Sequence, residues 1–314
     1  MKTLRTTDVA RAAGILRGGG LVAFPTETVY GLGADGLDAA AVRRIFAAKG
    51  RPGDNPLILH VGSPAEAAVY GALGDAAAAL AARFWPGPLT LVVPARAGLP
   101  AELRAGLATV ALRCPEHPMA RNLLAAAGRP LAAPSANRSG RPSPTSADAV
   151  LDDLDGRIDA VLDGGPCPRG LESTVLDCTG REPVILRLGA LPAEALGLAP
   201  RTVAAADGRS PGTRHRHYAP ALPVVLCGDL AEGLRRHPDA AVLWPAAEAA
   251  ALGLRPGPAV HWWSDRPEGR AAELFAALRR LERSGRPCIL APVLDARGLD
   301  AATMDRLRRA AGGP

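Results

Sequence analysis

Two basic residues stand together in a short, stiff segment that suits the binding of an anion. Lys49 and Arg51 lie in the segment Lys49–Pro56, which follows a predicted helix and contains two prolines. Among 37 lysines and arginines, the only lysines are Lys2 and Lys49, so a lysine here indicates a need for a compact charge. An ammonium and a planar guanidinium together can grip phosphate oxygens. The segment therefore predicts a phosphate site, with a solvated helix C-terminus as the alternative.

Three further segments carry hydroxyl, amide or carboxylate groups where loops are expected. Pro25–Asp35 follows a strand and predicts a ligand loop, although an ordinary connection with turns at its two glycines also fits. Residues 133–145 are rich in Ser, Pro and Asn and open a helix, where hydroxyl groups suit phosphates or simply cap the helix. A last cluster, Glu172-Ser173-Thr174, precedes Arg187 by one hairpin. Each of these segments alone is a weak signal.

Arg113 ends an otherwise apolar strand that is predicted over residues 109–113. Strand alternation puts Thr109, Ala111 and Arg113 on one face. A buried arginine needs an anionic partner, and a ligand carboxylate and a structural Asp or Glu are equally open. His60 also lies in an apolar strand, where a histidine is more often part of the core than a ligand-binding residue.

Several classes of protein are excluded by missing patterns. The chain has no GxxxxGK(S/T) or HExxH sequence, so a P-loop and a zincin are excluded. Any catalysis would rest on positioning and electrostatics. Five widely spaced cysteines indicate reduced, structural thiols. A net charge of +6 favours anionic partners such as nucleotides or RNA. No apolar run could span a membrane, and early charges interrupt any signal peptide, so we expect a cytoplasmic protein.

The elements that position these groups divide the chain into two parts. A length of 314 residues corresponds to about two domains. Residues 1–200 alternate short apolar strands with helices, and Asp8 and Asp38 are predicted N-caps. This favours a large α/β domain with a mixed sheet. Its strands are expected over 21–24, 57–61, 89–93, 109–113, 131–133, 160–162, 174–177 and 183–187, and its helices over 8–17, 38–48, 64–70, 75–84, 117–127 and 145–153.

Residues 222–314 are predicted to form a small, Rossmann-like domain with a parallel sheet. The sequence Cys227-Gly228-Asp229 after its first strand lacks the glycine fingerprint, so we expect no dinucleotide there. Residues 201–221 are predicted to be a linker, which contains the unusual segment Ser210–Pro220. In the second domain, strands over 223–227, 241–244, 259–263 and 288–291 alternate with helices over 229–236, 246–252, 267–283 and 300–311.

Taken together, these segments resemble the threonylcarbamoyl-AMP synthase family in its two-domain form, with a YrdC-type catalytic domain. The resemblance rests on motifs in chain order: PTETVYGLG from Pro25, KGRPGDNPL from Lys49, VALRCP from Val110, APSANRSG from Ala133 and EST from Glu172. The linker SPGTRHRHYAP resembles the segment that joins the two domains in longer members of the family. It departs from the usual pattern at Thr213 and His215, which leaves the closing contacts of the linker open.

The resemblance implies a reaction in which L-threonine, bicarbonate and ATP give threonylcarbamoyl-AMP and pyrophosphate. This would make the protein a nucleotidyltransferase that serves threonylcarbamoyladenosine modification of tRNA. Magnesium would accompany ATP, with no organic cofactor and with metal ligands unassigned. Downstream tRNA threonylcarbamoyl-transfer proteins would consume the product. The fold implied is a twisted mixed sheet with flanking helices, followed by the Rossmann-like domain.

The resemblance also assigns residues to the two substrates. Lys49 and Arg51 would meet the charge developing on phosphate as catalytic residues, and Tyr218, with His217, would reach over the nucleotide from a linker that acts as a lid. Threonine would contact Thr28, His60, Arg113, Ala133 and Ser173, with its carboxylate on Arg113. ATP would contact Lys49, Arg51, Asn55, Thr109, Ser135, Asn137, Ser143, Arg187 and Tyr218.

Two alternatives come from other classes of protein. A double-stranded RNA-binding protein fits the basic charge, but only 4% of the residues are aromatic, which is few for base stacking. A carbamoyltransferase of hydrogenase maturation shares the YrdC-type domain. The wide cysteine spacing and the chain length count against that reading. The sequence predicts neither the oligomeric state nor the role of the second domain.

Overall fold

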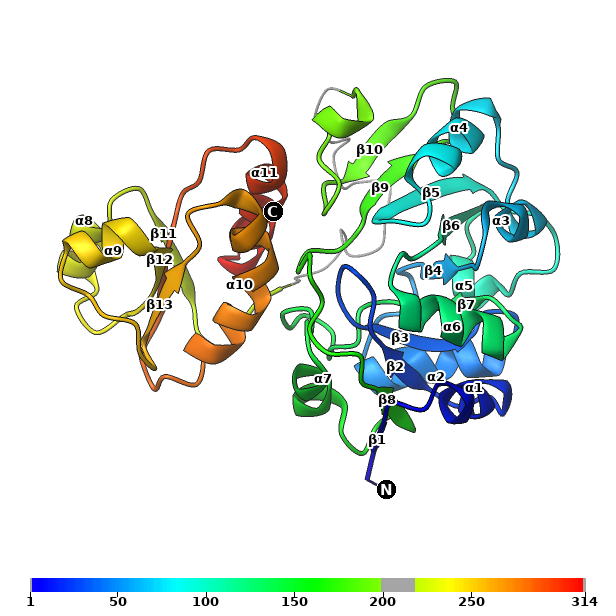
Figure 1. The fold of residues 1–314 in the computed structure, drawn as a ribbon, viewed down its shortest axis with the longest axis horizontal. Coiled ribbons are helices and arrows are strands. Elements are labelled where there is room, and N and C mark those ends of the chain that lie inside the picture. The colour runs from blue at the N-terminus through cyan, green and yellow to red at the C-terminus, as the bar shows by residue number, and fades with distance from the viewer. Residues whose placement is uncertain (1, 199–217, 313–314) are drawn as a thin grey trace.

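The computed structural model describes residues 2–198 and 218–312, which form two β-sheets flanked by helices (Figure 1). The first sheet has ten strands in the order β1-β8-β2-β3-β7-β4-β6-β5-β9-β10. Parallel and antiparallel pairs are mixed in it, which confirms the predicted mixed sheet. Its strands are β1 (Leu4–Thr6), β2 (Val22–Phe24), β3 (Gly31–Asp35), β4 (Ile58–His60), β5 (Leu89–Pro94), β6 (Thr109–Arg113), β7 (Leu131–Ala132), β8 (Ala160–Leu162), β9 (Thr174–Asp177) and β10 (Val184–Arg187).

Helices cover both faces of this sheet because successive side chains of a strand point to opposite sides. On β2, Ala23 belongs to the apolar cluster beneath α2 and α4, whereas Val22 and Phe24 belong to the cluster beneath α1 and α6. Asp8 and Asp38 cap α1 and α2 as predicted, each accepting a bond from a backbone N–H of the first turn. The helices are α1 (Val9–Arg17), α2 (Ala39–Lys49), α3 (Pro64–Tyr70), α4 (Asp75–Phe84), α5 (Ala101–Arg104), α6 (Pro118–Ala127) and α7 (Ala147–Leu154), followed by the 3-10 turn η1 (Glu194–Leu196).

The segment predicted as a ligand loop over Pro25–Asp35 is a loop only in its first half. From Gly31 it forms β3, which pairs antiparallel with β2. The two glycines serve packing rather than turns. A Cβ atom placed on Gly33 would come within 2.9 Å of the Phe24 ring, so only glycine fits against this side chain. The sequence also missed the short elements β1, α5 and η1.

The second sheet is all-parallel, with the strand order β11-β14-β12-β13, as predicted for the Rossmann-like part. Trp244 and Trp263 are fully buried in its core. Its strands are β11 (Val224–Cys227), β12 (Ala241–Pro245), β13 (Val260–Trp263) and β14 (Ile289–Pro292), and its helices are α8 (Leu230–Arg236), α9 (Ala246–Ala251), α10 (Pro267–Leu281) and α11 (Gly298–Ala310).

Helices α10 and α11 pack against the first part of the chain (Figure 1). One apolar cluster joins Val29, Leu171 and Ala190 of the first part to these two helices. At Gly170, whose φ is +70°, a Cβ atom would lie 2.4 Å from a carbonyl oxygen of α10, so the close approach requires glycine. The predicted linker, including Thr213, His215 and His217, lies mostly outside the described residues, so the predicted domain limits stay predictions. Among the helices of the described ranges, none is long and apolar enough to cross a membrane.

Candidate functional site

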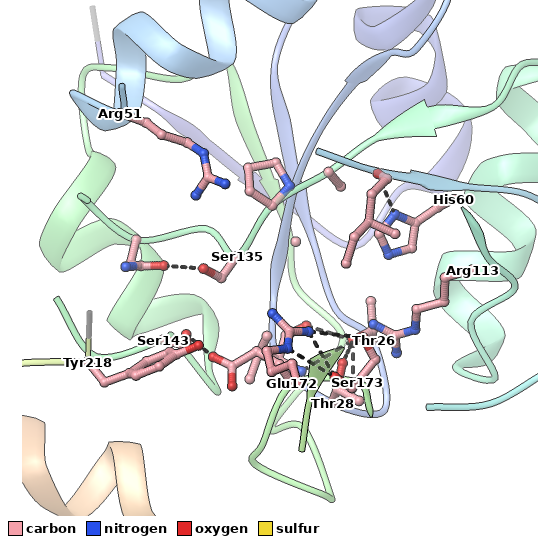
Figure 2. A pocket seen from close by; sticks show the side chains of 17 residues that line it. Thr26, Thr28, Arg51, His60, Arg113, Ser135, Ser143, Glu172, Ser173 and Tyr218 are labelled. Atoms are coloured by element: carbon pink, nitrogen blue, oxygen red, sulfur yellow. Dashed lines mark hydrogen bonds between the residues drawn. The ribbon is translucent and has the colours of Figure 1, made fainter. Parts of the chain in front are cut away.

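A cavity opens where the ends of several strands of the first sheet meet the loops 25–30 and 133–145 (Figure 2). Most of the predicted site residues line it: Thr28, Arg51, His60, Arg113, Ala133, Ser135, Asn137, Ser143, Ser173, Arg187 and Tyr218. The wall also contains residues to which the sequence assigned no role: Thr26, Val29, Gly31, Ile58, Pro134 and Glu172. Of these, Glu172 was visible as part of a polar cluster, and Thr26 as a hydroxyl of the ligand-loop motif.

One end of the cavity is built around Arg113, at the end of β6. Its Nη2 donates to Oε1 of Glu27 at 2.6 Å, and both side chains are 5% exposed. The anionic partner left open by the sequence is therefore a structural carboxylate, although Arg113 still lines the cavity. Burial alone would raise the pKa of Glu27, but the charge and hydrogen bond of Arg113, together with backbone hydrogen bonds, outweigh burial and lower that pKa. Glu27 also accepts the backbone N–H of Glu116, which fixes its orientation.

His60 faces Arg113 from the end of β4, the parallel neighbour of β6 (Figure 2). It is buried, and burial first, then the charge of Arg113, lowers its pKa to about 3. Its ring is therefore neutral at physiological pH. A neutral imidazole can hydrogen-bond a ligand without adding a further cation beside Arg113. His60 is thus both a core residue and a wall residue.

Hydroxyl groups complete this end of the cavity. The hydroxyls of Thr26 and Thr28 lie 2.7 Å apart, and Thr26 also donates to the carbonyl of Val29. The hydroxyl of Ser173 lies 2.8 Å from that of Thr90. These bonds hold the side chains in place before any ligand binds, which reduces the ordering cost of binding.

The other end of the cavity carries Arg51, on the same side as Ser135 and Tyr218 (Figure 2). Gly50, with a φ of +61°, ends α2 in the left-handed conformation and turns the chain so that Arg51 points inward. Arg51 donates through Nη2 to the carbonyl of Pro56 at 3.2 Å, while its buried Nε has no partner among the described residues. Burial lowers the pKa of Arg51 to about 10, so it stays cationic at neutral pH.

Arg187, from the end of β10, supplies another cation to the wall. Its Nη2 donates to the carbonyl of Ser173 at 2.8 Å and to the hydroxyl of Ser173 at 3.2 Å. Burial lowers the pKa of its guanidinium below the ordinary value. Together with Arg51 and Arg113, it gives the cavity a cationic lining that suits carboxylates and phosphates.

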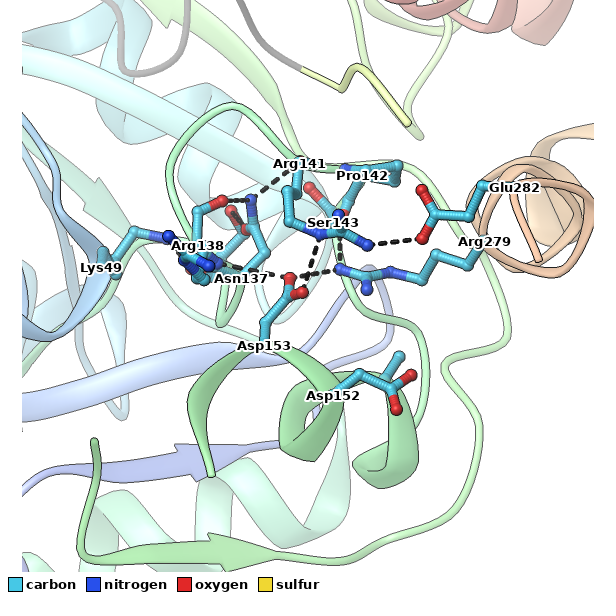
Figure 3. A network of polar contacts seen from close by, with 12 residues as sticks. Lys49, Asn137, Arg138, Arg141, Pro142, Ser143, Asp152, Asp153, Arg279 and Glu282 are labelled. Carbon is cyan, nitrogen blue, oxygen red and sulfur yellow. Dashed lines mark hydrogen bonds and ion pairs between the residues drawn. The ribbon is translucent and has the colours of Figure 1, made fainter. Parts of the chain in front are cut away.

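Lys49 does not line the cavity; it supports the loop that does (Figure 3). It is the last residue of α2 and is 3% exposed, and its ammonium donates to the carbonyls of Ser135 and Asn137. The alternative of a solvated helix C-terminus is therefore wrong for Lys49, because its side chain is buried. Burial, and then the nearby charge of Arg51, lowers its pKa. Contact with phosphate stays a prediction for this residue.

The loop 133–145 is further held by the side-chain amide of Asn137 and by Asp153 of α7 (Figure 3). The hydroxyl of Ser135 donates to Asn137 at 2.6 Å, and the Asn137 amide donates to the carbonyls of Arg138 and Arg141. Asp153 pairs with Arg141 at 2.8 Å. It also pairs at 2.7 Å with Arg279, which reaches across from α10. The second domain thus anchors this loop.

Two predicted residues lie beside the cavity rather than on its wall. Asn55 is buried next to Arg51, whose Nη2 is 3.4 Å from the Asn55 carbonyl. Thr109 begins β6, pairs with Pro94 and shares a strand face with Arg113, four residues away from the cavity end of the strand. Their expected contacts with ATP stay predictions.

Tyr218 is the first residue described after the gap at 199–217, and it lines the cavity. Its ring stacks on Phe275 of α10, with centroids 5.5 Å apart and an angle of 24° between the planes. Its φ is +66°, a conformation that a tyrosine adopts only when its surroundings hold it. Burial raises the pKa of its hydroxyl.

The donor set of the cavity does not fit a magnesium ion held by protein ligands. Among the described residues, no group of three or more His, Cys, Asp and Glu side chains is placed to hold a metal. The carboxylate on the cavity wall, Glu172, already accepts bonds from Ser143 and Arg306. A magnesium ion would therefore be held by phosphate oxygens and water, as this ion commonly is.

Family models cover both parts of the chain. A model for Sua5, YciO and YrdC proteins, described as telomere recombination, matches residues 14–189, and a model described as the threonylcarbamoyl-AMP synthase C-terminal domain matches residues 182–312. The fold and the matches define a YrdC-type protein that carries an additional C-terminal domain.

Relatives that match over nearly their whole length identify the family more closely. The threonylcarbamoyl-AMP synthase of Pyrococcus abyssi is 45% identical over 316 residues, covering 96% of this chain and 93% of its own. That of Bacillus subtilis is 39% identical and covers 99% of this chain and 95% of its own. The crystal structure of P. abyssi Sua5 complexed with L-threonine is similar, with a TM-score of 0.88 and 41% identity, covering 99% of this chain and 97% of that one. The chain belongs to the threonylcarbamoyl-AMP synthase family.

Proposed function

We propose that this protein is an L-threonylcarbamoyladenylate synthase, which converts L-threonine, bicarbonate and ATP into threonylcarbamoyl-AMP and pyrophosphate for tRNA modification. The observation that carries the proposal is the convergence of Arg51, Arg113 and Arg187 on one cavity lined with hydroxyls. The reaction brings together a carboxylate, a carbamate and a triphosphate, and such a cavity neutralises all three. Full-length similarity to synthases supports this function over an RNA-binding protein or a hydrogenase-maturation carbamoyltransferase.

The chemistry requires no covalent bond to the protein. The amine of threonine captures the carbon of bicarbonate and water leaves, which gives a carbamate. A carbamate oxygen then attacks the α-phosphorus of ATP, and the bond between the α-phosphorus and the bridging oxygen breaks to release pyrophosphate. The step transfers AMP, so the enzyme is a nucleotidyltransferase. The protein contributes by holding the reactants in line and by neutralising charge.

The end of the cavity around Arg113 suits threonine. Arg113 can pair with the substrate carboxylate while Glu27 fixes its guanidinium. Thr28 and Ser173 offer hydroxyls, and the neutral ring of His60 adds a polar contact. The backbone at Ala133 closes this pocket. A solved relative is described as complexed with L-threonine, which supports threonine as the substrate.

The end around Arg51 suits ATP. Arg51 and Arg187 are placed to bind phosphate oxygens, and the loop with Ser135, Asn137 and Ser143 offers polar groups to the nucleotide. Tyr218 covers this end. Lys49 supports the loop from below by holding its carbonyls. We assign the charge that develops during AMP transfer chiefly to Arg51, because its guanidinium faces the cavity.

Magnesium accompanies ATP in this proposal, bound to the phosphates, and no step is assigned to it. The proteins that transfer threonylcarbamoyl to tRNA are the expected consumers of the product. Direct affinity for RNA and a cytoplasmic location stay predictions from charge and sequence.

The test is detection of the product. The protein is incubated with ATP, Mg²⁺, threonine and ¹³C-bicarbonate, and the mixture is analysed by mass spectrometry. An adenylate that carries both threonine and one ¹³C atom is expected. ATP binding without such an adenylate would show that the cavity serves another reaction. Serine in place of threonine is the matched control, because it lacks only the methyl group.

A further inference from the structure

Arg306 of α11 reaches from the second domain to the wall of the cavity in the first. Its side chain is fully buried, and its Nε donates to Oε2 of Glu172 at 3.0 Å. Its Nη2 donates to the carbonyl of Leu188 at 2.8 Å, and Nη1 pairs with Asp305 on its own helix. A guanidinium with no solvent exposure is held in one place by these bonds, so it is a fixed charge rather than a surface contact.

Glu172, the partner of Arg306, is an unexpected group in this cavity. It lines the end proposed for ATP and accepts the hydroxyl of Ser143, which lines the same wall. A carboxylate here would repel a triphosphate unless a cation neutralises it. The charged and titratable groups around Glu172 are Arg306 from α11, Arg187 from β10 and Tyr218. Burial would raise the pKa of Glu172, but Arg306 first, and then Arg187, lower it.

The guanidinium of Arg306 also lies over the ring of Tyr218. Its guanidinium carbon lies 5.0 Å from the ring centroid of Tyr218, whose ring stacks on Phe275. Two features of the nucleotide end therefore depend on this residue: the neutralised state of Glu172, with its bond to Ser143, and the position of the aromatic cover. Neither feature requires Arg306 to touch a substrate.

We propose that Arg306 is a positioning residue through which the second domain completes the ATP site of the first. It compensates the charge of Glu172 and holds Ser143 and Tyr218 in their binding orientations. This inference rests on the proposed function, because it concerns the nucleotide of that reaction. It also gives the Rossmann-like domain a role for which no bound ligand of its own is needed.

The test measures ATP binding and pyrophosphate release in the full chain. Arg306→Met is expected to weaken ATP binding at least about tenfold at pH 7.5, with a smaller change for threonine, because an uncompensated carboxylate then faces the triphosphate. The loss should shrink as the pH is lowered and Glu172 protonates. The double variant Arg306→Met/Glu172→Gln should regain most of the affinity. Arg306→Lys, which keeps the charge, should lose less ATP affinity than Arg306→Gln. If the methionine variant does not fold, these two variants are compared instead.

The matched control is Arg270→Met. Arg270 forms a comparable ion pair of low exposure with Asp300, but within the second domain and away from the cavity. It should leave ATP binding unchanged. Equal losses in the two variants, wild-type affinity in Arg306→Met, or no recovery in the double variant would each overturn the inference. If the wild type binds ATP but makes no adenylate, the proposed function fails while the binding comparison still decides the role of Arg306. If the wild type binds no ATP, both fail.

Discussion

Replacing Arg113 by Met tests the ion pair on which the threonine end of the cavity is built. The change removes the cation 2.6 Å from Glu27 and leaves a carboxylate that is 5% exposed without its counter-charge. Removing one partner of a buried pair costs about 3–5 kcal/mol. For domains of this size, that corresponds to a fall in Tm on the order of 10 °C. The variant should also lose the stabilisation that added threonine gives to the wild type.

The loss of folding stability in Arg113→Met should depend on pH in a definite direction. In the wild type, Arg113 holds the pKa of Glu27 below its unfolded value of about 4.3. That contribution is present above the unfolded pKa and is lost as the pH falls through the folded pKa. In Arg113→Met the lowering by Arg113 is lost and burial remains the largest influence on Glu27, so its pKa rises. The variant therefore gains stability relative to the wild type as the carboxyl protonates. The stability gap should therefore be largest near pH 7.5 and narrow below about pH 5.

Denaturant unfolding at pH 7.5 and pH 4.5 measures the gap directly. Arg129→Met is the matched control, because Arg129 also pairs with a buried aspartate, Asp35, but is 52% exposed. Its effect, screened by solvent, should stay at or below about 1 kcal/mol and change little between these pH values. A gap for Arg113→Met that is independent of pH, or that widens in acid, would refute the assignment of Glu27 as its buried ionised partner.

Three further predictions concern the loop, the strand packing and the histidine. Lys49→Met leaves the carbonyls of Ser135 and Asn137 without their buried donor. The free energy of unfolding should fall by about 1–3 kcal/mol, and hydrogen exchange in the loop 133–145 should become faster. Unchanged exchange would contradict the supporting role of Lys49. Gly33→Ala places a methyl group 2.9 Å from Phe24 and should cost about 1–3 kcal/mol, whereas Gly53→Ala, with open space around it, should be neutral in the same unfolding experiment. Because the pKa of His60 is about 3, threonine affinity measured by calorimetry should show no step attributable to its titration between pH 5 and 8. A step near pH 6.5 that disappears in His60→Asn would show that the ring is not buried in its neutral form.

The sequence predicted most elements because their signals are local. The side chain of Asp38 caps its helix by accepting a hydrogen bond from a backbone N–H only two residues later. In β2, the side chains on either side of Ala23 point to the opposite face of the sheet, so neighbouring residues belong to different core clusters. The strand β3 was missed because glycines usually indicate turns, whereas here they make room for Phe24 on the neighbouring strand. That reason becomes visible only once the two strands are paired.

The site residues were recognisable by type, but their partners were not. Glu27 lies 86 residues before Arg113, and Glu172 lies 134 residues before Arg306. No periodicity connects positions so far apart, so the sheet order and the packing of α11 had to be known first. Lys49 shows the same limit. Its sequence position predicted a phosphate contact, with a solvated helix end as the alternative, but the carbonyls that it binds come from a distant loop.

The most direct test of the central claim is pyrophosphate release from ATP, with threonine and bicarbonate each present or omitted. We expect release only when both are present, with threonine strongly preferred over serine, and loss of release in Arg51→Met. Release that is independent of threonine, or no release from a folded protein that binds ATP, would contradict it.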